Sequence, residues 1–362
     1  MTESRPIRWG IIGTGNVAQH FARGLGFADN APLAAVLSRN KANAEAFAAA
    51  FGGASAFDDP KQFLAAPDVD AVYIATPNNR HAVDALSVID AGKAVLVEKP
   101  FALNADEAQS VIDRAKERGV FCMEAMWMRF LPLVREAKRI ADSGELGKIT
   151  FLTADFSVPT TFDAGSHFVD PAKGGGALLD RGVYCLSLAD FLLGEPVEAE
   201  SFATRGPTGV DEQAAVTLRY RDGAVAQVWT SVTTAGTNTA IVHGTKGKLT
   251  LHEPFYRPHR LSIDHVRPQS ITAPGLPGGP SLKTKIKENK IVQKIGRKLQ
   301  AALKGPAVDR VEPFAGNGYS FEADEVGRCL RLGLKESDVM PHAATLRVMR
   351  LMDDIRSQWH TM

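Results

Sequence analysis

The sequence predicts an α/β N-terminal domain of the Rossmann type, built on a doubly wound parallel sheet, followed by an α+β domain rich in strands. Short apolar strands alternate with helical segments in the first third of the chain, which is the pattern of a parallel sheet. Strands joined directly by tight turns come after it. The 362 residues suffice for two domains. We place them at residues 1–124 and 125–362, and we expect the last helix, about residues 341–359, to pack back on the first domain.

Composition and charge exclude several classes of protein. Hydrophobic residues make up 44% and charged residues 23% of the chain, as in ordinary globular proteins, and the net charge of +1 gives no field that would attract nucleic acid. The first residues, MTESRPIRWGIIG, contain no apolar stretch of signal length, and no later segment has the length of a membrane span. We therefore expect a cytoplasmic protein. The three cysteines are far apart and the nine histidines lack ligand spacing, so we expect no metal site.

The first strand, residues 8–12, leads directly into the sequence GTGNVA. The spacing G-x-G-x-x-A, placed before a helix expected over about residues 16–27, is typical of a dinucleotide-binding turn. The first glycine makes the tight turn, the second lets the backbone approach a pyrophosphate, and the small third residue lets helix and strand pack closely. Val17, Phe21 and Leu25 would share one face of the helix. The cofactor contacts expected in this turn are those of Gly13, Thr14, Gly15, Asn16 and Val17.

The residues after the next strand, 33–37, indicate which nucleotide is bound. NAD sites usually place an acidic residue here to hold the ribose 2′-hydroxyl. This chain has Ser38-Arg39-Asn40 instead. A guanidinium can form paired hydrogen bonds with the 2′-phosphate of NADP, whereas a carboxylate would repel that phosphate. Ser38 and Arg39 therefore favour NADP over NAD as the cofactor.

The alternation of strands and helices continues to about residue 123. In a doubly wound sheet, ligands bind outside the carboxyl ends of the strands. Two strands end at that edge in the sequences TPNNRH and EKP. We expect strands at residues 71–75, 94–97 and 120–123 and helices at residues 42–51, 82–91 and 105–118. The cofactor contacts expected at this edge are those of Thr76, Pro77, Asn78, His81, Glu98 and Lys99.

The chain after residue 147 has the composition of a series of strands. Asp222-Gly223 joins two of them as a hairpin turn, and the segment GTKG joins another pair. A run of strands after an α/β half predicts a second domain. We expect these strands at residues 148–157, 214–220, 224–232, 239–243 and 249–252.

Five motifs occur in a fixed order: GIIGTGNVA, ATPNNRHA, VLVEKPF, MEAMWMRFLP and GGGALLDRGVY. With them the chain resembles the Gfo/Idh/MocA oxidoreductases, and within that family the branch of dimeric dihydrodiol dehydrogenase, NADP-dependent xylose dehydrogenase and glucose–fructose oxidoreductase. The resemblance covers nearly the whole chain apart from about residues 265–312. It implies a second domain with a large, mostly antiparallel open sheet, one face of which closes over the nicotinamide. It also implies a homo-oligomer formed through the back of that sheet.

The resemblance also implies catalytic residues. It places the lysine of the EKP motif, Lys99, beside the nicotinamide and the reacting oxygen, and it places a catalytic aspartate and tyrosine at Asp180 and Tyr184. These two are four residues apart and would share one face of a helix that begins near Ala177. We expect hydride transfer between C4 of NADP and a hydroxyl-bearing carbon of a sugar or cyclic polyol or diol.

In this mechanism Tyr184 removes the hydroxyl proton, and the nearby charge of Lys99 lowers the pKa of the phenol. Lys99 also stabilises charge that develops on the substrate oxygen. Asp180 holds either the lysine or the substrate hydroxyl in place. The opposite assignment, in which Lys99 and Tyr184 exchange roles, stays open.

Four further residues are expected to line the substrate because of their positions in these motifs. Aromatic side chains suit the apolar face of a sugar or cyclic diol, although core packing is an equally good interpretation of Trp127. Arg181 and His167 stand where this branch more often has an apolar residue and an arginine, which speaks against specificity for xylose or a dihydrodiol. The four expected substrate residues are Trp127, Arg129, Phe156 and His167.

Two other functions are compatible with these motifs. The protein could use a bound nicotinamide transiently, as the NAD-dependent glycosidases of the family do, or it could be a sensor that binds NADP without catalysis. The presence of Lys99, Asp180 and Tyr184 together disfavours the sensor. Separately, the basic segment 283–304 has helical spacing, and we expect it to pack on the second domain, with an anionic membrane surface as the alternative contact.

Overall fold

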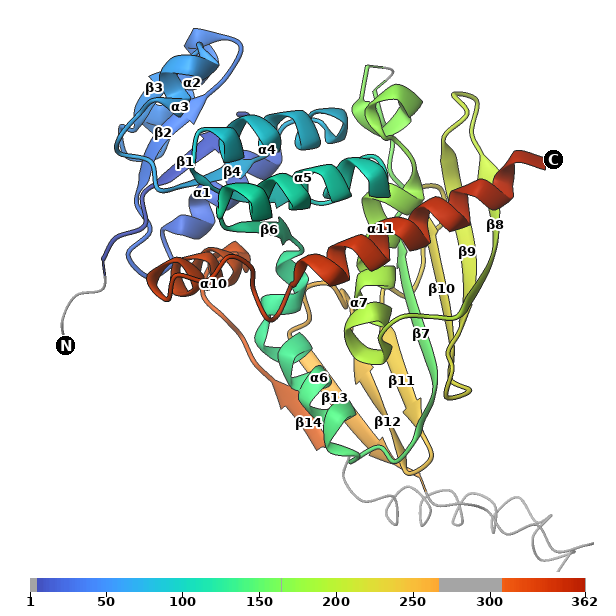
Figure 1. Cartoon of the computed structure of the whole chain (residues 1–362). Coiled ribbons are helices and arrows are strands. Elements are labelled where there is room, and N and C mark those ends of the chain that lie inside the picture. Colours follow the sequence, from blue (N-terminus) through green and yellow to red (C-terminus); the bar gives the residue numbers. More distant parts are fainter. Residues whose placement is uncertain (1–4, 164, 267–307, 362) are drawn as a thin grey trace, which may run out of the picture.

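The computed structural model describes residues 5–163, 165–266 and 308–361, and it contains two sheets (Figure 1). The first sheet has six strands in the order β3-β2-β1-β4-β5-β6, and all neighbouring strands in it are parallel. The strand order reverses between β1 and β4, which is the point where such sheets bind dinucleotides. The strands are β1 (Trp9–Ile12), β2 (Leu33–Leu37), β3 (Ser55–Phe57), β4 (Ala71–Ile74), β5 (Ala94–Glu98) and β6 (Cys122–Ala125).

Helices connect these strands, and local sequence signals explain where several of them begin. The side chains of Asn40 and Asp59 accept hydrogen bonds from backbone N–H groups in the first turns of α2 and α3. At the start of α5, Asn104 accepts from the N–H of Glu107 while Glu107 accepts from the N–H of Leu103. The helices are α1 (Asn16–Leu25), α2 (Lys41–Ala50), α3 (Pro60–Leu64), α4 (His81–Asp90) and α5 (Ala105–Arg118).

The second sheet has eight strands in the order β14-β13-β12-β11-β7-β10-β9-β8. Its neighbouring strands are antiparallel except for β7 and β10, which run parallel. The α/β half followed by a large, mostly antiparallel sheet is the architecture that the sequence predicts. The strands are β7 (Ile149–Ser157), β8 (Glu198–Arg205), β9 (Asp211–Arg219), β10 (Val225–Ser231), β11 (Ala240–Gly244), β12 (Gly247–Leu251), β13 (Arg260–His265) and β14 (Val308–Val311).

Three helices cover one face of the second sheet: α6 (Pro132–Ser143), α7 (Val183–Leu193) and α11 (His342–Ser357) (Figure 1). The last of them, α11, also contacts the first part of the chain. Thr345 donates a hydrogen bond to Glu124 at 3.0 Å, and Asp353 accepts one from the N–H of Ala105 at 2.7 Å. Because these contacts reach β6 and the start of α5, α11 ties the two sheets together.

The structure also contains elements that the sequence patterns do not predict. Helix α10 (Tyr319–Arg331) packs on α1, and β8, β13 and β14 extend the second sheet at its two edges. Of the three residues expected on one face of α1, Phe21 and Leu25 are buried, whereas Val17, in the first turn of the helix, is 38% exposed. In the described part of the chain, no helix is long and apolar enough to cross a membrane. The basic segment 283–304 lies outside the described residues.

Candidate active site

The turn between β1 and α1 has the geometry of a nucleotide cradle. Gly13 has a φ of +108°, and a Cβ atom there would lie 2.5 Å from the carbonyl oxygen of Ala75, so only glycine fits this position. A Cβ atom on Gly15 would meet no other atom within 4 Å. Gly15 precedes α1, whose N-terminus has no side-chain cap. The turn therefore leaves open space at a helix N-terminus, where backbone N–H groups can receive an anionic phosphate.

The end of β2 borders the same turn. The hydroxyl oxygens of Thr14 and Ser38 lie 3.5 Å apart, and the N–H of Asn40 donates to the Ser38 hydroxyl at 3.4 Å. Arg39 is exposed, and no ion pair joins it to another described residue. The guanidinium is thus available beside the predicted ribose position.

The residues after β4 hold the edge of the sheet together. Thr76 donates a hydrogen bond to Asp84 at 2.9 Å, and both ring nitrogens of His81 lie 2.8 Å from carbonyl oxygens, those of Thr76 and Pro100. The side chain of Asn78 donates to the carbonyl oxygen of Gly174 at 3.1 Å. These contacts fix the TPNNRH loop relative to both the EKP motif and the glycine-rich segment.

Lys99 stands at the end of β5 and joins the two halves of the site. Its Nζ atom donates hydrogen bonds to the carbonyl oxygen of Asp180 at 2.9 Å and to Oδ1 of the same residue at 3.0 Å. It also lies 4.9 Å from the centre of the Tyr184 ring. Burial opposes the ammonium form, but the charge of Asp180 and its hydrogen bond with the amine act against burial, and the pKa of Lys99 is raised. The amine is therefore a cation at neutral pH.

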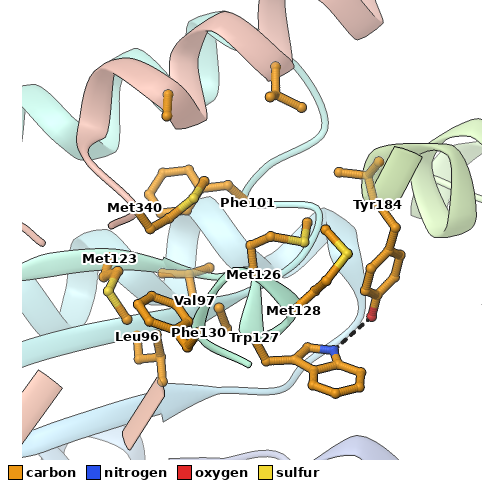
Figure 2. Close-up of a cluster of buried hydrophobic side chains, with 14 of the residues drawn as sticks. Leu96, Val97, Phe101, Met123, Met126, Trp127, Met128, Phe130, Tyr184 and Met340 are labelled. Carbon is orange, nitrogen blue, oxygen red and sulfur yellow. Dashed lines mark hydrogen bonds between the residues drawn. The ribbon is translucent and has the colours of Figure 1, made fainter. Parts of the chain in front are cut away.

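Tyr184 is only 6% exposed, and its hydroxyl oxygen accepts a hydrogen bond from Nε1 of Trp127 at 2.9 Å (Figure 2). Burial raises the pKa of Tyr184 to about 12, although the charge of Lys99 acts in the opposite direction. The expectation that Lys99 lowers this pKa below its ordinary value is therefore wrong, because burial is the larger effect. At neutral pH both Lys99 and Tyr184 carry their protons.

Asp180 and Tyr184 are presented by a continuous helical segment that begins after three glycines. Residues Leu178–Gly182 form a π-helical turn, and α7 follows it directly. The carboxylate of Asp211, on β9, accepts a hydrogen bond from the N–H of Leu178 at 2.7 Å. Gly176 has a φ of +121° and packs against the same carboxylate, which leaves no room for a side chain. The second sheet thus holds the start of this segment in place.

Aromatic side chains pack around the ring of Tyr184. Trp127 stacks on Tyr319 with 5.1 Å between ring centres, and Phe156 stacks on Tyr256 with 4.1 Å between centres. The centre of the Tyr184 ring lies 5.5 Å from that of Phe156 and 5.7 Å from that of Tyr256. Tyr256 and Tyr319 were not predicted from the sequence. Tyr319 lies in the C-terminal stretch GYSFEADEV, which belongs to the resemblance, whereas no local pattern points to Tyr256.

The other two expected substrate residues differ in their surroundings. His167 is half-buried, and burial lowers the pKa of its ring while the charges of Asp180 and Lys99 act on it in opposite directions. Arg129 is 1% exposed and donates to Ser187 at 2.8 Å and to Asp190 at 2.9 Å. Its guanidinium is thus engaged inside the protein, where it also lies 5.2 Å from the centre of the Phe191 ring.

Glu98 turns its side chain into the interior. The Tyr73 hydroxyl donates a short hydrogen bond to Oε1, and the N–H of Lys99 donates to Oε2 at 3.0 Å. Burial raises the pKa of Glu98 to about 7, while Lys99 and Tyr73 act in the opposite direction. The carboxyl group is thus held between the Tyr73 hydroxyl and the backbone of Lys99.

No group of three or more His, Cys, Asp or Glu side chains in the described ranges is arranged to hold a metal ion. The chemistry available at the site is that of an ammonium, a phenol and a carboxylate gathered at the carboxyl edge of a dinucleotide-binding sheet.

Comparisons with known proteins agree with this geometry. The family described as an oxidoreductase family with an NAD-binding Rossmann fold matches residues 7–126, and the GFO/IDH/MocA C-terminal domain matches residues 134–250. The chain is 33% identical to trans-1,2-dihydrobenzene-1,2-diol dehydrogenase of Oryctolagus cuniculus over 326 residues, which are 90% of this chain and 89% of that protein.

Solved structures show the same architecture. KijD10, a 3-ketoreductase from Actinomadura kijaniata in complex with NADP and TDP-benzene, is 25% identical with a TM-score of 0.79, and the match covers 98% of both chains. Levoglucosan dehydrogenase in complex with NADH and levoglucosan shares the fold with a TM-score of 0.80 at 21% identity, over 98% of this chain and 97% of that one.

Fold and site together define an NAD(P)-binding oxidoreductase of the Rossmann type. The chain belongs to the Gfo/Idh/MocA oxidoreductase family.

Proposed function

We propose that the protein is an NADP-dependent oxidoreductase that transfers a hydride between C4 of the nicotinamide and a hydroxyl-bearing carbon of a sugar or of a cyclic polyol or diol. One observation carries the proposal. The Lys99 ammonium, at the carboxyl end of β5, lies 3.0 Å from the Asp180 carboxylate and 4.9 Å from the Tyr184 ring. The Lys99 ammonium and the Tyr184 phenol therefore lie close together at the carboxyl edge of the sheet, where we expect the nicotinamide of a bound cofactor.

The protonation states of Lys99 and Tyr184 suggest how they act. When bound, the nicotinamide supplies or accepts the hydride. The Tyr184 phenol, protonated at neutral pH, donates its proton to the substrate oxygen in reduction and takes it back in oxidation. The Lys99 ammonium stabilises negative charge on that oxygen. Asp180 orients the amine by accepting two hydrogen bonds from it, one at the carboxylate and one at the carbonyl oxygen.

Preference for NADP is supported by the residues at the end of β2. Arg39 is exposed and carries a guanidinium, and the Ser38 hydroxyl lies beside it. Both groups donate hydrogen bonds, so they suit a 2′-phosphate, whereas an acidic residue at this position would suit a 2′-hydroxyl. KijD10 is described in complex with NADP, in agreement with this proposal.

The substrate class is supported by the aromatic rings around Tyr184. Phe156 and Tyr256 are half-buried and offer apolar faces that can stack on a sugar or carbocyclic ring, whereas Trp127 is buried and stacks on Tyr319. One relative is named for its action on a dihydrobenzenediol, and the KijD10 structure holds TDP-benzene as a ligand. A neutral cyclic compound with adjacent hydroxyl groups fits this wall.

The proposal is tested in two steps. NADPH binding is first measured by fluorescence, and then aldoses, inositols and cyclic diols are screened for a net change in absorbance of the reduced nicotinamide. Net change with at least one compound is the expected result. Release of sugar from a glycoside without net change would instead support a glycosidase, and tight binding with neither reaction would support a sensor.

We further propose that the protein forms a homo-oligomer through the face of the second sheet turned away from α6, α7 and α11. Across this face Phe202 pairs with Ala215, and Ala215 pairs with Trp229, which places a row of apolar side chains side by side. Phe202 is 70% exposed in the single chain. Light scattering should give an oligomer for the unmodified protein and a smaller species for Phe202→Asp, whereas a monomer in both cases would contradict the proposal.

A further inference from the structure

A group of buried acids and tyrosines interacts with Glu98, the residue before Lys99, and takes no part in the mechanism above. Tyr73 comes from β4, Glu98 from β5, and Tyr319 and Glu322 from α10. Glu322 is 0% exposed and Glu98 is 5% exposed. Both carboxyl groups are thus buried, and the charge of Glu98 acts on Glu322.

Glu98 can exist in both of its charge states. Its two oxygens accept hydrogen bonds from the Tyr73 hydroxyl and from the N–H of Lys99, and these bonds favour the carboxylate. Burial favours the protonated form and brings the pKa to about 7. The group can therefore gain or lose its proton close to neutral pH.

Glu322 differs because neither of its oxygens has a hydrogen-bond partner among the described residues. Burial, together with the charge of Glu98, raises the pKa of Glu322 well above its ordinary value, so this carboxyl group keeps its proton. A buried acid without partners costs stability. Natural chains keep such groups mainly at functional sites.

The surroundings of Glu98 determine what can change its charge. The positive charge of Lys99 lowers the pKa of Glu98 and favours its carboxylate form. The negative charge of Glu124 raises that pKa and favours the protonated form. A further positive charge at the carboxyl end of β5 would favour the Glu98 carboxylate. The titratable groups that face Glu98 are Lys99 on its own strand, Tyr73 on β4, Glu124 on β6, Tyr184 on α7, and Tyr319 and Glu322 on α10.

We propose that Glu98, held by Tyr73 and backed by the neutral Glu322, releases its proton when the positively charged oxidised nicotinamide occupies the crevice and regains a proton when the reduced, neutral ring replaces it. The inference rests on the proposed function, because that function places the nicotinamide at this strand end. No bond is formed or broken in the cluster other than the O–H bond of Glu98, and the proton goes to solvent. The acid cluster thus compensates the charge of the cofactor.

The test compares the affinities of the two redox forms of the cofactor across the neutral pH range. The Kd values of NADP⁺ and NADPH are measured by calorimetry between about pH 6 and pH 8, and their ratio is followed. Titration of the 2′-phosphate affects both forms alike and cancels in the ratio. Because NADP⁺ binding releases one proton and NADPH binding does not, we expect the affinity for NADP⁺ relative to NADPH to rise with pH. The rise should be up to about tenfold per pH unit, as for one linked proton.

Three variants separate the cluster from general effects on folding. Glu98→Gln has no dissociable proton, so the ratio should no longer depend on pH. Tyr73→Phe removes a donor to the carboxylate, so the transition should move to higher pH. Glu325→Gln changes a carboxyl group on the same helix that is paired with Arg328 instead, and it should behave like the unmodified protein.

Infrared spectroscopy tests the cluster without cofactor. The band of a protonated carboxyl group should be present at neutral pH and should weaken in Glu322→Gln. A spectrum unchanged by that substitution, or a Kd ratio independent of pH in the unmodified protein, would overturn this inference and leave the proposed function standing. Failure of both redox forms to bind at any pH would instead overturn the proposed function and this inference with it.

Discussion

The side-chain amine of Lys99 donates hydrogen bonds to two oxygens of Asp180, the carbonyl oxygen at 2.9 Å and Oδ1 at 3.0 Å. The two residues are far apart in the sequence. Lys99 directly follows β5 of the first sheet, whereas Asp180 lies in the π-helical turn before α7. The double contact fixes the direction of the amine, and the carboxylate helps to keep it charged. Tyr184, beside the same amine, completes a site with one cation and one phenol.

Replacing Arg39 tests the proposed preference for NADP. Arg39→Ala should weaken NADPH binding by about tenfold or more, because a charge-assisted hydrogen bond to phosphate is lost. NADH binding should stay the same, since NADH has no 2′-phosphate. Fluorescence titration of both cofactors measures the effect, and Arg23→Ala, an arginine bonded to Gln19 in α1, serves as the control. Equal losses for both cofactors would refute the assignment.

Alanine substitutions at Gly15 and Gly13, in the same turn, should have different effects: the first on cofactor binding and the second on stability. Gly15 has a φ of −71° and open space where a Cβ would lie, so Gly15→Ala should fold normally yet bind NADPH about tenfold more weakly because the methyl group takes up room needed by phosphate. Gly13→Ala should lower the free energy of unfolding by roughly 1–3 kcal/mol because of backbone strain and the clash with Ala75. Thermal unfolding and NADPH titration separate the two effects. Normal binding by Gly15→Ala would mean that the phosphate lies elsewhere.

Trp127 affects the acidity of Tyr184. The Trp127 hydrogen bond lowers the pKa of Tyr184, so Trp127→Phe should raise that pKa and move the alkaline limb of the pH–kcat profile to higher pH. Loss of one neutral hydrogen bond, worth about 0.5–1.5 kcal/mol, predicts a roughly three- to tenfold lower kcat. Trp229→Phe, on the second sheet, should leave the profile in place. An unchanged alkaline limb in Trp127→Phe would separate Tyr184 from the proton transfer.

Glu322 should destabilise the fold at neutral pH. Its pKa is raised in the folded protein, so the folded state holds a proton that the unfolded state releases above the ordinary glutamate pKa. Stability therefore falls as pH rises from about 4.3 toward the folded-state pKa, by up to about 1.4 kcal/mol per pH unit. Glu322→Gln removes this dependence and should be the more stable protein at neutral pH. Denaturant unfolding at several pH values checks it, and a Gln variant that is less stable at neutral pH would contradict the assignment.

Most strands and helices in the first part of the chain could be predicted because they have local patterns of their own, although the short elements β3 and α3 were not predicted. The turn GTGNVA, the capping residues Asn40 and Asn104, and the apolar runs of β4 and β5 are all local signals. The edge strand β8 could not be predicted in the same way, because exposed and half-buried residues alternate along it without a strongly apolar face.

The site was predictable only in part for a similar reason. Lys99, Asp180 and Tyr184 lie in motifs, so the resemblance could bring them together. Tyr256 and Tyr319 reach the site through long-range packing on Phe156 and Trp127, which leaves no trace in the local sequence. The balance between burial and the charge of Lys99 at Tyr184 also depends on three-dimensional surroundings, which is why the predicted direction of that pKa shift was wrong.

The most direct test of the account is the kcat of Lys99→Met, measured with the best substrate from the screen and with NADPH binding determined separately. The matched control is Lys93→Met, since Lys93 lies just before the other end of β5 and donates to the carbonyl oxygens of Ala66 and Val69. We predict that kcat falls by about 10²–10⁴-fold in Lys99→Met while NADPH still binds, and that Lys93→Met keeps its kcat. A kcat of Lys99→Met within a few-fold of the unmodified protein would contradict the proposed chemistry.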